Sequence, residues 1–535
     1  MAGRIVLNIG MNIKAALLVS LAVLPRLFTA PCCARAAEEY PPEVLAALEK
    51  AGGNRPEIEK TLQYFREAGD PLKLKAAYFL TANMPGQNYA QYELRNSSGA
   101  SVPFDPLAHA GYEAMVKAWN ETEKIYGPMD WKAGAVTEDI SSLKSSALIE
   151  NINLAFKAWR EKPWAAGVPF DDFLEYVLPY RASNEPVEPW RAYFLEKYKD
   201  LPSEMKNPRD LTEAAALINE DIKKWFKFDP IFYRHPTDQG LAEMLRRGAG
   251  RCEDMTNLAI YAMRANAIPV AGDYTPYWAN TGNNHAWNAL IIPGAPAVPF
   301  MGALEDPGVY RLGNRPAKAY RSTFGRQSGS LAAGLGAKEK APRWFKKENY
   351  KDVTDAYAET GTIEIEMAAP PSEDAKTPYL AVFNSGEWQI IGWGTFRKGK
   401  ARFENYAKGI VYLPVYYSSG TAVPAGPAFI YTGGAEVRAL IPSKVPAVTV
   451  RAASTTRRTI AHTTDNIART FLTPGKIYEL HYWNGKWLPI SEQKAGKDRL
   501  KFKDVPNNAL LWLKEKGSGG EERIFTYDAG AQVWW

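Results

Sequence analysis

The sequence predicts a multidomain fold with an N-terminal α-helical domain, a central α+β domain and two C-terminal β-sandwich modules. Apolar residues recur at helical spacing in the first part, as at Ile58, Leu62 and Phe65. After Tyr350, β-rich runs separated by glycine turns dominate, and one such hairpin occurs twice. The chain is also longer than one hydrophobic core ordinarily supports. The expected boundaries are 1–36 for a signal peptide, 37–200 for the helical domain, 201–345 for the central domain, and 346–450 and 451–535 for the modules.

The first 36 residues are typical of an export signal. Lys14 precedes the apolar run 15–24, and Ala34-Arg-Ala36 supplies small residues at a cleavage site. This run is too short to stay in a bilayer as a spanning helix, and no later segment is long and apolar enough. The mature protein is therefore expected to be secreted, periplasmic or on the cell surface. Lipoprotein anchoring is disfavoured because Pro31 stands before the first of the two cysteines, where a small residue is usual.

Removal of this segment changes the charge and the cysteine count. It holds four basic residues and no acidic one, so the formal charge falls from +6 to +2, which gives no reason to expect nucleic-acid binding. Cys32 and Cys33 leave with it, so Cys252 becomes the one thiol of an exported chain and is expected to be buried or used in chemistry. The scattered histidines give no metal-ligand pair and no nucleotide-binding motif occurs, so neither a metal nor another cofactor is predicted.

The helical domain is expected mainly to pack against the centre of the protein. Its aromatic and charged loop 178–191 has two possible roles, because it can belong to this packing or can wall a cleft. In the central domain, helices are expected near 212–226 and 241–247. The stretch 325–337 is rich in glycine and alanine and has no periodicity, so it is expected to be an exposed linker or a mobile loop.

The two β-modules are predicted from an internal repeat. The stretch YLAVFNSGEW at 379–388 is echoed by YELHYWNGKW at 478–487, and each copy continues into an apolar strand, at 410–413 or at 509–513. A glycine turn between β-rich runs favours a hairpin in both copies. Accessory β-modules of this kind bind glycans or peptides in some proteins and act as spacers in others, and both alternatives stay open here.

Cys252 follows a glycine turn and begins a predicted helix. Gly250 precedes it by two residues, and apolar residues from Met255 to Ala262 recur on one helical face. A helix N-terminus offers unpaired N–H groups and the positive end of the macrodipole, which are expected to lower the pKa of the thiol. The same N–H groups can stabilise an oxyanion. Cys252 is therefore a candidate nucleophile.

A histidine and two acids follow in the order that a catalytic triad needs. A strand is predicted to begin at His285, so its imidazole can lean towards the helix terminus and act as a general base. Trp287 shares that face of the strand and is expected to pack beneath the site. Asp306, or alternatively Glu305, is expected to hold the tautomer and orientation of the imidazole.

The series Gly-x-Cys-x-Asp, Arg-Ala-x-x-Ile-Pro, His-Ala-Trp and Asp-Pro resembles the transglutaminase-like superfamily. The resemblance covers about 201–324 and implies a papain-like arrangement, with the cysteine-bearing helix against an antiparallel sheet. It implies Cys252 as nucleophile, His285 as base and Asp306 as orienting acid. The stretch before Asp306 is longer and richer in proline than the simplest family pattern, which keeps Glu305 as an alternative. Such enzymes supply an oxyanion-stabilising side chain from upstream, and Gln239 is the candidate for it.

The implied reaction is acyl transfer through a thioester, with Cys252 attacking an amide carbonyl and His285 protonating the leaving amine. Hydrolysis by a peptidase or amidase is preferred because water is abundant outside the cell. The expected substrate is a peptide, a protein or a glycopeptide. The alternatives are a protein cross-linking transglutaminase, a glycopeptide amidase, and a non-catalytic secreted protein that binds glycans or peptides through its β-modules.

Overall fold

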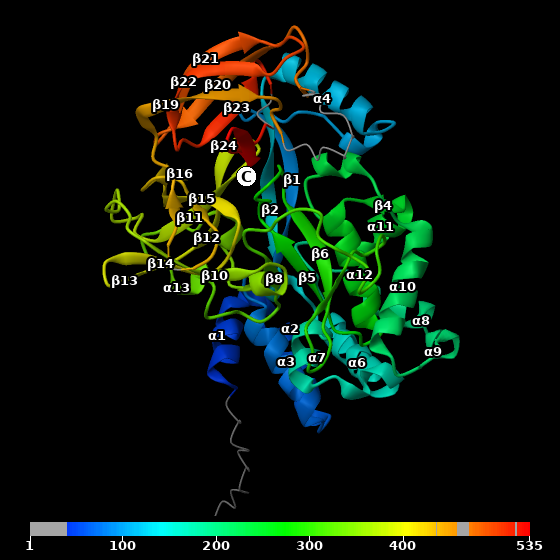
Figure 1. Ribbon diagram of the computed structural model, residues 1–535. Coiled ribbons are helices and arrows are strands. Elements are labelled where there is room, and N and C mark those ends of the chain that lie inside the picture. The colour runs from blue at the N-terminus through cyan, green and yellow to red at the C-terminus, as the bar shows by residue number, and fades with distance from the viewer. Residues whose placement is uncertain (1–39, 435, 457–469, 519–521) are drawn as a thin grey trace, which may run out of the picture. The chain divides into compact units, whose positions relative to one another are not determined.

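The computed structural model describes residues 40–434, 436–456, 470–518 and 522–535 (Figure 1). The expected signal peptide at 1–36 lies outside these residues. Pro42–Trp535 form one compact unit. Within the described ranges, no helix combines the length and the apolar character that crossing a membrane requires.

The N-terminal part is mainly helical, as predicted. Helix α2 buries Ile58, Leu62 and Phe65, the apolar residues whose helical spacing the sequence showed. Asp70 caps α3 by accepting hydrogen bonds from the backbone of Leu72 and Lys73. The α-helices of this part are α1 (Pro42–Lys50), α2 (Arg55–Glu67), α3 (Pro71–Asn83), α4 (Tyr112–Tyr126), α5 (Asp139–Ser142), α6 (Ser145–Glu161), α7 (Phe170–Tyr176), α8 (Trp190–Lys197) and α9 (Leu201–Glu204).

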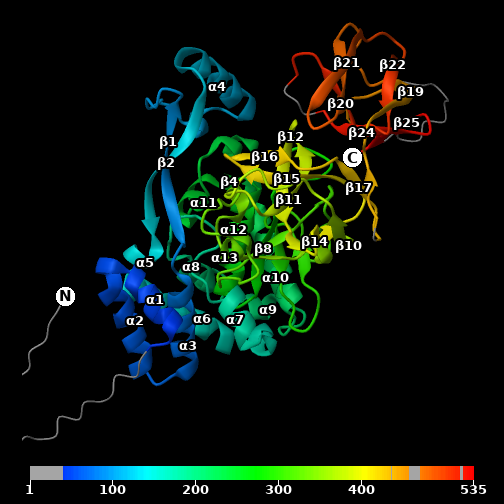
Figure 2. The same ribbon diagram turned by 90° about the vertical axis from the view of Figure 1, so that its left-hand side faces the viewer.

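The helical part also contains an antiparallel hairpin that the sequence did not predict. It is formed by β1 (Asn88–Asn96) and β2 (Met129–Glu138), and α4 lies at one end of it (Figure 2). Leu94 is buried in β1 and Met129 in β2, and the other residues of both strands are exposed or half-buried. Neither strand therefore has the alternation of apolar and polar residues that identifies a strand in a sequence.

The central part has α-helices packed against a five-stranded antiparallel sheet of order β7-β6-β5-β8-β9. Its helix α12 packs on β5 and β6 (Figure 1). Every residue of α12 except Glu253 is buried, which is the pattern of a helix covered on all sides. The elements are α10 (Leu211–Trp225), α11 (Leu241–Arg247), α12 (Cys252–Ala265), β5 (Val270–Thr275), β6 (His285–Leu290), β7 (Val298–Phe300), β8 (Tyr320–Ser322) and β9 (Tyr350–Asp352).

Buried arginines join the helical part to α12. Arg191 on α8 donates to the main-chain oxygen of Arg264 at 2.7 Å, and Arg264 donates to the main-chain oxygen of Arg181 at 3.0 Å. Burial lowers the pKa of Arg191 to about 9 and that of Arg264 to about 10. The carbonyl oxygens around both groups replace the water that burial removes. In the loop 178–191, the side chains of Arg181, Glu185 and Arg191 are all buried, so these residues pack against the protein.

The centre of the stretch 325–337 is packed, so the prediction of an exposed linker or mobile loop is wrong for Ser330 and Leu331, whereas most of the other residues are exposed. Ser330 caps the short helix α13 (Leu331–Gly334), and both Ser330 and Leu331 are buried. Leu331 belongs to a core that includes Tyr350, whose hydroxyl accepts a hydrogen bond from the Leu331 N–H at 3.0 Å. The composition was misleading because two leucines of the segment, Leu331 and Leu335, pack against this core.

Among the described residues after β9, the regular elements are strands apart from the short 3-10 helix Thr354–Ala356, and the strand pairs are antiparallel. In the first module, residues of a β10-β14-β13 sheet and of a sheet built around β11 and β15 share one core. In the second module, a separate core is shared by two sheets, β19-β22 and β21-β20-β23-β24-β25. The strands are β10 (Thr360–Ile365), β11 (Pro378–Asn384), β12 (Glu387–Trp393), β13 (Thr395–Arg397), β14 (Lys400–Ala407), β15 (Ile410–Ser418), β16 (Thr421–Pro424), β17 (Phe429–Tyr431), β18 (Arg438–Ala439), β19 (Ser443–Ala452), β20 (Ile477–Trp483), β21 (Trp487–Lys494), β22 (Leu500–Asn507), β23 (Leu511–Glu515), β24 (Ile524–Asp528) and β25 (Ala531–Trp534).

The repeated sequence forms a hairpin in both modules, β11–β12 in the first and β20–β21 in the second. In the first copy, Ser385 and Gly386 have φ values of 49° and 84° and make a two-residue turn. Positive φ at both turn positions is what a tight hairpin requires, and glycine adopts it without strain. The aromatic side chains of the two copies pack together, with ring centroids 5.4 Å apart for Trp388 and Trp483.

Candidate active site

Cys252 lies at the start of α12, and the motif around it fixes how this helix begins. The carboxylate of Asp254 accepts hydrogen bonds from the backbone N–H groups of Arg251 at 3.0 Å and Gln239 at 2.9 Å. A Cβ atom at Gly250 would come within 2.6 Å of the Asp254 Cβ, so only glycine fits there. The glycine and the aspartate of Gly-x-Cys-x-Asp thus hold the turn that presents the cysteine.

The Cys252 thiol is 7% exposed and donates a hydrogen bond to Glu253 Oε2 at 3.1 Å. Burial, followed by the charge and hydrogen bond of Glu253, raises the pKa of the thiol. The N–H of Ala286, which also hydrogen-bonds to the sulfur, and the charge of Arg251 oppose this effect but do not outweigh it. The prediction that the helix terminus lowers the thiol pKa is therefore wrong for this state, because burial and a neighbouring carboxylate dominate.

Glu253 is a member of the site that the sequence reasoning missed. It is the one residue of α12 that is not buried, and its side chain is 25% exposed. Its Oε1 accepts a hydrogen bond from Asn284 Nδ2 at 3.1 Å, and its Oε2 lies 3.3 Å from Arg251 Nε. An acid directly after the cysteine, in the first turn of the helix, was the available signal. Glu253 therefore links Cys252 to the residue that precedes His285.

His285 begins β6 and is enclosed by aromatic rings. Its ring centroid lies 5.7 Å from that of Trp278 in a stacked arrangement, and its Nε2 lies 2.8 Å from the hydroxyl of Tyr310. Burial lowers the pKa of His285, and the charge of Glu253 opposes that shift. The imidazole is therefore held towards its neutral form, which is the form that can accept a proton.

Trp287 is fully buried beneath this site. Its ring lies 5.9 Å from the ring of His285, 6.4 Å from that of Trp278 and 5.0 Å from that of Tyr357, centroid to centroid. These contacts correspond to the packing role predicted for Trp287.

Asp306 and Glu305 lie in the turn that carries Tyr310. The Asp306 carboxylate accepts hydrogen bonds from Asn219 and Lys223 of α10, both at 2.8 Å. The main-chain oxygen of Asp306 accepts the N–H of Tyr310 at 3.4 Å. Among the hydrogen bonds of the described residues, the one made by the His285 ring is to Tyr310 and to neither acid. Asp306 thus anchors the turn that brings Tyr310 to the imidazole.

Tyr310 is the second residue that the sequence reasoning missed. Burial raises the pKa of its hydroxyl, and the charges of Glu305 and Cys252 add to this effect. The structure therefore pairs Tyr310 with His285, and the Cys252 sulfur meets the N–H of the next residue, Ala286. No motif predicted the tyrosine, because its position depends on the fold of the turn after Asp306.

Gln239 packs behind the helix start. It is 1% exposed, and its Nε2 donates to the main-chain oxygen of Ala249 at 3.0 Å. A Cβ at Gly250 would lie 2.8 Å from that nitrogen. The amide thus braces the glycine turn in this state, and the oxyanion role stays a prediction.

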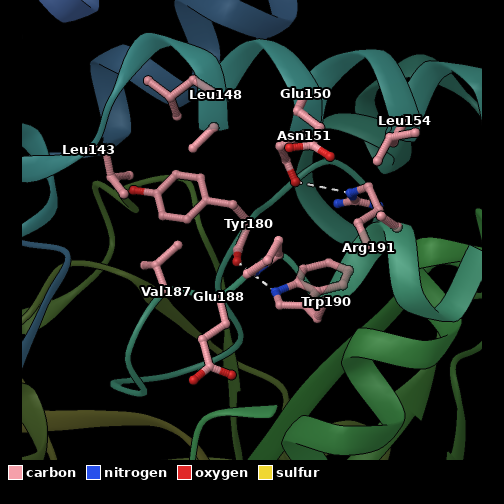
Figure 3. Close-up of a pocket in the computed structure, with 13 residues that line it drawn as sticks. Leu143, Leu148, Glu150, Asn151, Leu154, Tyr180, Val187, Glu188, Trp190 and Arg191 are labelled. Atoms are coloured by element: carbon pink, nitrogen blue, oxygen red, sulfur yellow. Dashed lines mark hydrogen bonds between the residues drawn. The ribbon is translucent and has the colours of Figure 1, made fainter. Parts of the chain in front are cut away.

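A separate cavity of about 260 Å³ lies between α6 and the loop 178–191 (Figure 3). Its lining is mainly apolar, with Leu148 and Leu154 of α6 on one side and Trp190 on the other. Arg191 donates to Asn151 at 2.9 Å at its edge. Its lining includes neither Cys252 nor His285. This part of the loop therefore borders a different space from the thiol.

Part of the chain is similar to known proteins. Residues 199–299 match the family model of the transglutaminase-like superfamily. A crystal structure of a candidate cysteine protease from Cytophaga hutchinsonii is similar at 18% identity and a TM-score of 0.17, over 22% of this chain and 44% of that chain. No curated protein matches the chain. The chain carries a domain of the transglutaminase-like superfamily.

Proposed function

We propose that the protein is an exported cysteine hydrolase that cleaves an amide bond through a thioester on Cys252. One observation carries the proposal: the Cys252 sulfur, at the start of a buried helix, is hydrogen-bonded by the N–H of Ala286, the residue next to His285. The proposed nucleophile and the proposed base therefore come from elements that meet at one point. The family match over 199–299 supports the same chemistry.

In the proposed reaction, the thiol proton passes to His285 and the sulfur forms a bond to the amide carbonyl carbon. The N–H groups at the start of α12 stabilise the oxyanion. The C–N bond then breaks, and the imidazolium gives its proton to the leaving amine. Water attacks the thioester, which releases a carboxylic acid and restores the thiol.

Before attack, two hydrogen bonds of the described state must be exchanged. The thiol donates to Glu253, and the imidazole is paired with Tyr310. The described state is therefore a resting state, in which burial and Glu253 keep the thiol protonated. Tyr310 and Asp306 are alternative candidates for the group that orients His285, Tyr310 by direct contact and Asp306 through the turn it anchors.

The proposed substrate is a peptide or a peptide-like amide, and water is the preferred acceptor. We do not assign a glycan site to the β-modules, because the tryptophans of the repeated hairpins contact each other. Trp483 and Trp487 have ring centroids 5.2 Å apart, and Trp487 and Trp512 lie 5.3 Å apart. These rings pack the protein interior, which accounts for part of the high aromatic content.

The test is labelling of Cys252 by a thiol-directed probe, followed by peptide mapping, in the native protein and in Cys252→Ala and His285→Ala variants. The proposal expects labelling at Cys252 that slows in His285→Ala, because the imidazole is proposed to take the thiol proton. Equal labelling in His285→Ala, or no labelling of Cys252 in the native protein, would refute it. Release of peptide fragments supports hydrolysis, whereas incorporation of a labelled primary amine identifies a cross-linking enzyme. Release of sugar with an intact peptide chain identifies a glycopeptide amidase.

A further inference from the structure

The loop between β5 and β6 contacts the His285 ring. Trp278, in this loop, is 5% exposed and stacks on the imidazole with centroids 5.7 Å apart. The loop closes on itself through a hydrogen bond from the Trp278 N–H to the Asn283 oxygen at 3.1 Å. A shift of this loop would therefore move both the stacked ring and the start of β6.

The tip of the first module's hairpin holds this loop from outside the transglutaminase-like domain. Asn384 is 2% exposed, and its Nδ2 lies within hydrogen-bonding distance of three loop carbonyls, those of Trp278 at 3.0 Å, Thr281 at 2.9 Å and Asn283 at 3.0 Å. An amide NH₂ group has two hydrogens, so the three oxygens converge on one donor. Removal of this one buried donor would therefore take a hydrogen-bonding partner from three loop carbonyl oxygens at once.

Close packing at the same tip leaves the loop little room. A Cβ atom at Gly282 would come within 2.9 Å of the Ser385 hydroxyl oxygen. That hydroxyl also accepts a hydrogen bond from the Asn283 N–H at 3.4 Å. The two-residue turn therefore packs closely against the loop and is also hydrogen-bonded to it.

The second module adds a charged donor to the same loop. Arg523 is 4% exposed and donates to the main-chain oxygen of Ala279 and to that of Phe383, both at 2.6 Å. Burial lowers its pKa to about 10, so it stays protonated at neutral pH. One guanidinium thus ties the loop to the strand that carries Asn384.

We propose that Asn384 is a positioning residue for His285 and that it acts through Trp278. The proposal rests on the role proposed for His285 and gives the β-modules a function of their own. They brace the loop that sets the imidazole, in place of the ligand-binding and spacer roles that the sequence left open. The group that braces the loop must donate hydrogen bonds, because it faces carbonyl oxygens.

The test follows the His285 imidazole by NMR in the full chain labelled with [¹³Cε1]histidine, with its signal assigned from a His285→Gln variant. In Asn384→Ala the loosened loop admits water, so the pKa of His285 is expected to rise towards its ordinary value. Labelling of Cys252 is expected to slow by up to about 100-fold, the effect that a displacement of about 1 Å in a reacting group can have. Asn384→Asp keeps the size of the side chain but not the donor and is expected to behave like Asn384→Ala.

The control is Asn484→Ala, which truncates an exposed turn residue of the second hairpin copy and is expected to leave both readouts unchanged. In a Trp278→Leu background, Asn384→Ala is expected to add little further change, since the effect passes through Trp278. Folded Asn384→Ala and Asn384→Asp variants with an unaltered His285 titration would overturn the proposal, as would loss of folding in both. If native Cys252 does not label, the proposed function fails, whereas the His285 titration still decides the positioning role.

Discussion

Replacement of Glu253 by glutamine is expected to make the Cys252 thiol more reactive. In the described state the carboxylate accepts the thiol hydrogen at 3.1 Å. After burial, it is the largest cause of the raised pKa of the thiol. Glutamine has nearly the same shape, and its one oxygen can still accept the hydrogen bond from Asn284, which places its NH₂ group at the thiol. The change therefore removes both the negative charge and the acceptor of the thiol hydrogen.

The size of the effect follows from this geometry. A charge within about 4–6 Å shifts a pKa by about 1–3 units. Glu253 is 25% exposed and is also paired with Arg251, so we expect the lower part of this range, a fall of about 1–1.5 units in the thiol pKa. The thiolate fraction at neutral pH then rises by about 10- to 30-fold. A thiolate of lower pKa is also a weaker nucleophile, by about half of that change in logarithmic units, so alkylation should accelerate by about 3- to 6-fold.

The assay is the rate of alkylation by iodoacetamide between about pH 5 and 10, with peptide mapping to follow Cys252 alone. The expected result is a higher rate at pH 7 and a pH profile displaced to lower pH. Glu243→Gln is the matched control, because Glu243 also lies in the first turn of a helix but pairs with Arg247. An unchanged profile would refute the view that Glu253 keeps the thiol protonated. A slower rate would instead indicate that the carboxylate assists removal of the proton.

The other predictions concern the partner of the imidazole and the stability of the fold. Tyr310→Phe is expected to alter the pH dependence of Cys252 labelling, because the hydroxyl contacts the imidazole ring. Asp306→Asn is expected mainly to lower Tm, because the carboxylate anchors the turn. The reverse result would favour Asp306 as the group that orients His285. Asp273→Asn should cost about 3–5 kcal/mol in the free energy of unfolding, measured with urea, because it leaves Arg321 buried and uncompensated. A loss below 1 kcal/mol would contradict that reasoning. Burial alone would raise the pKa of Asp306, but hydrogen bonds from Lys223 and its neighbours lower it below the ordinary value. The ionised carboxylate therefore stabilises the fold above pH 3.8, and this stabilisation is lost as the pH falls through the folded-state pKa. Lys223→Met should therefore reduce the fall in Tm between about pH 6 and pH 2, and an equal fall in both proteins would contradict this assignment.

The sequence was most informative where one local pattern determines one local structure. The turn around Gly250, the helix that begins at Cys252 and the strand that begins at His285 were all predicted from spacing alone, and the structure contains each of them. The hairpins of the repeat were predicted for the same reason. Each of these elements is specified by residues a few positions apart, so its pattern does not depend on the rest of the fold.

The electrostatics of the site were not predictable, because they depend on burial and on loop geometry. The helix-terminus argument for Cys252 ignored how completely the thiol is removed from water and where the Glu253 side chain turns. Likewise, Tyr310 reaches the imidazole only because the turn after Asp306 folds back, and its hydroxyl has no sequence signature. The β1–β2 hairpin escaped prediction for a different reason, since its strands bury few residues and lack alternation.

The two hairpin copies show why a repeat in sequence does not imply a repeat in role. Asn384 in the first copy aligns with Trp483 in the second, and both side chains are buried. The first copy meets the backbone of the loop before His285, where carbonyl oxygens need a donor. The second meets aromatic rings, with Trp483 against Trp388 of the first copy. Each copy therefore carries a side chain suited to its own neighbour. The second module contacts the first through these rings and also reaches the loop before His285 directly, through Arg523.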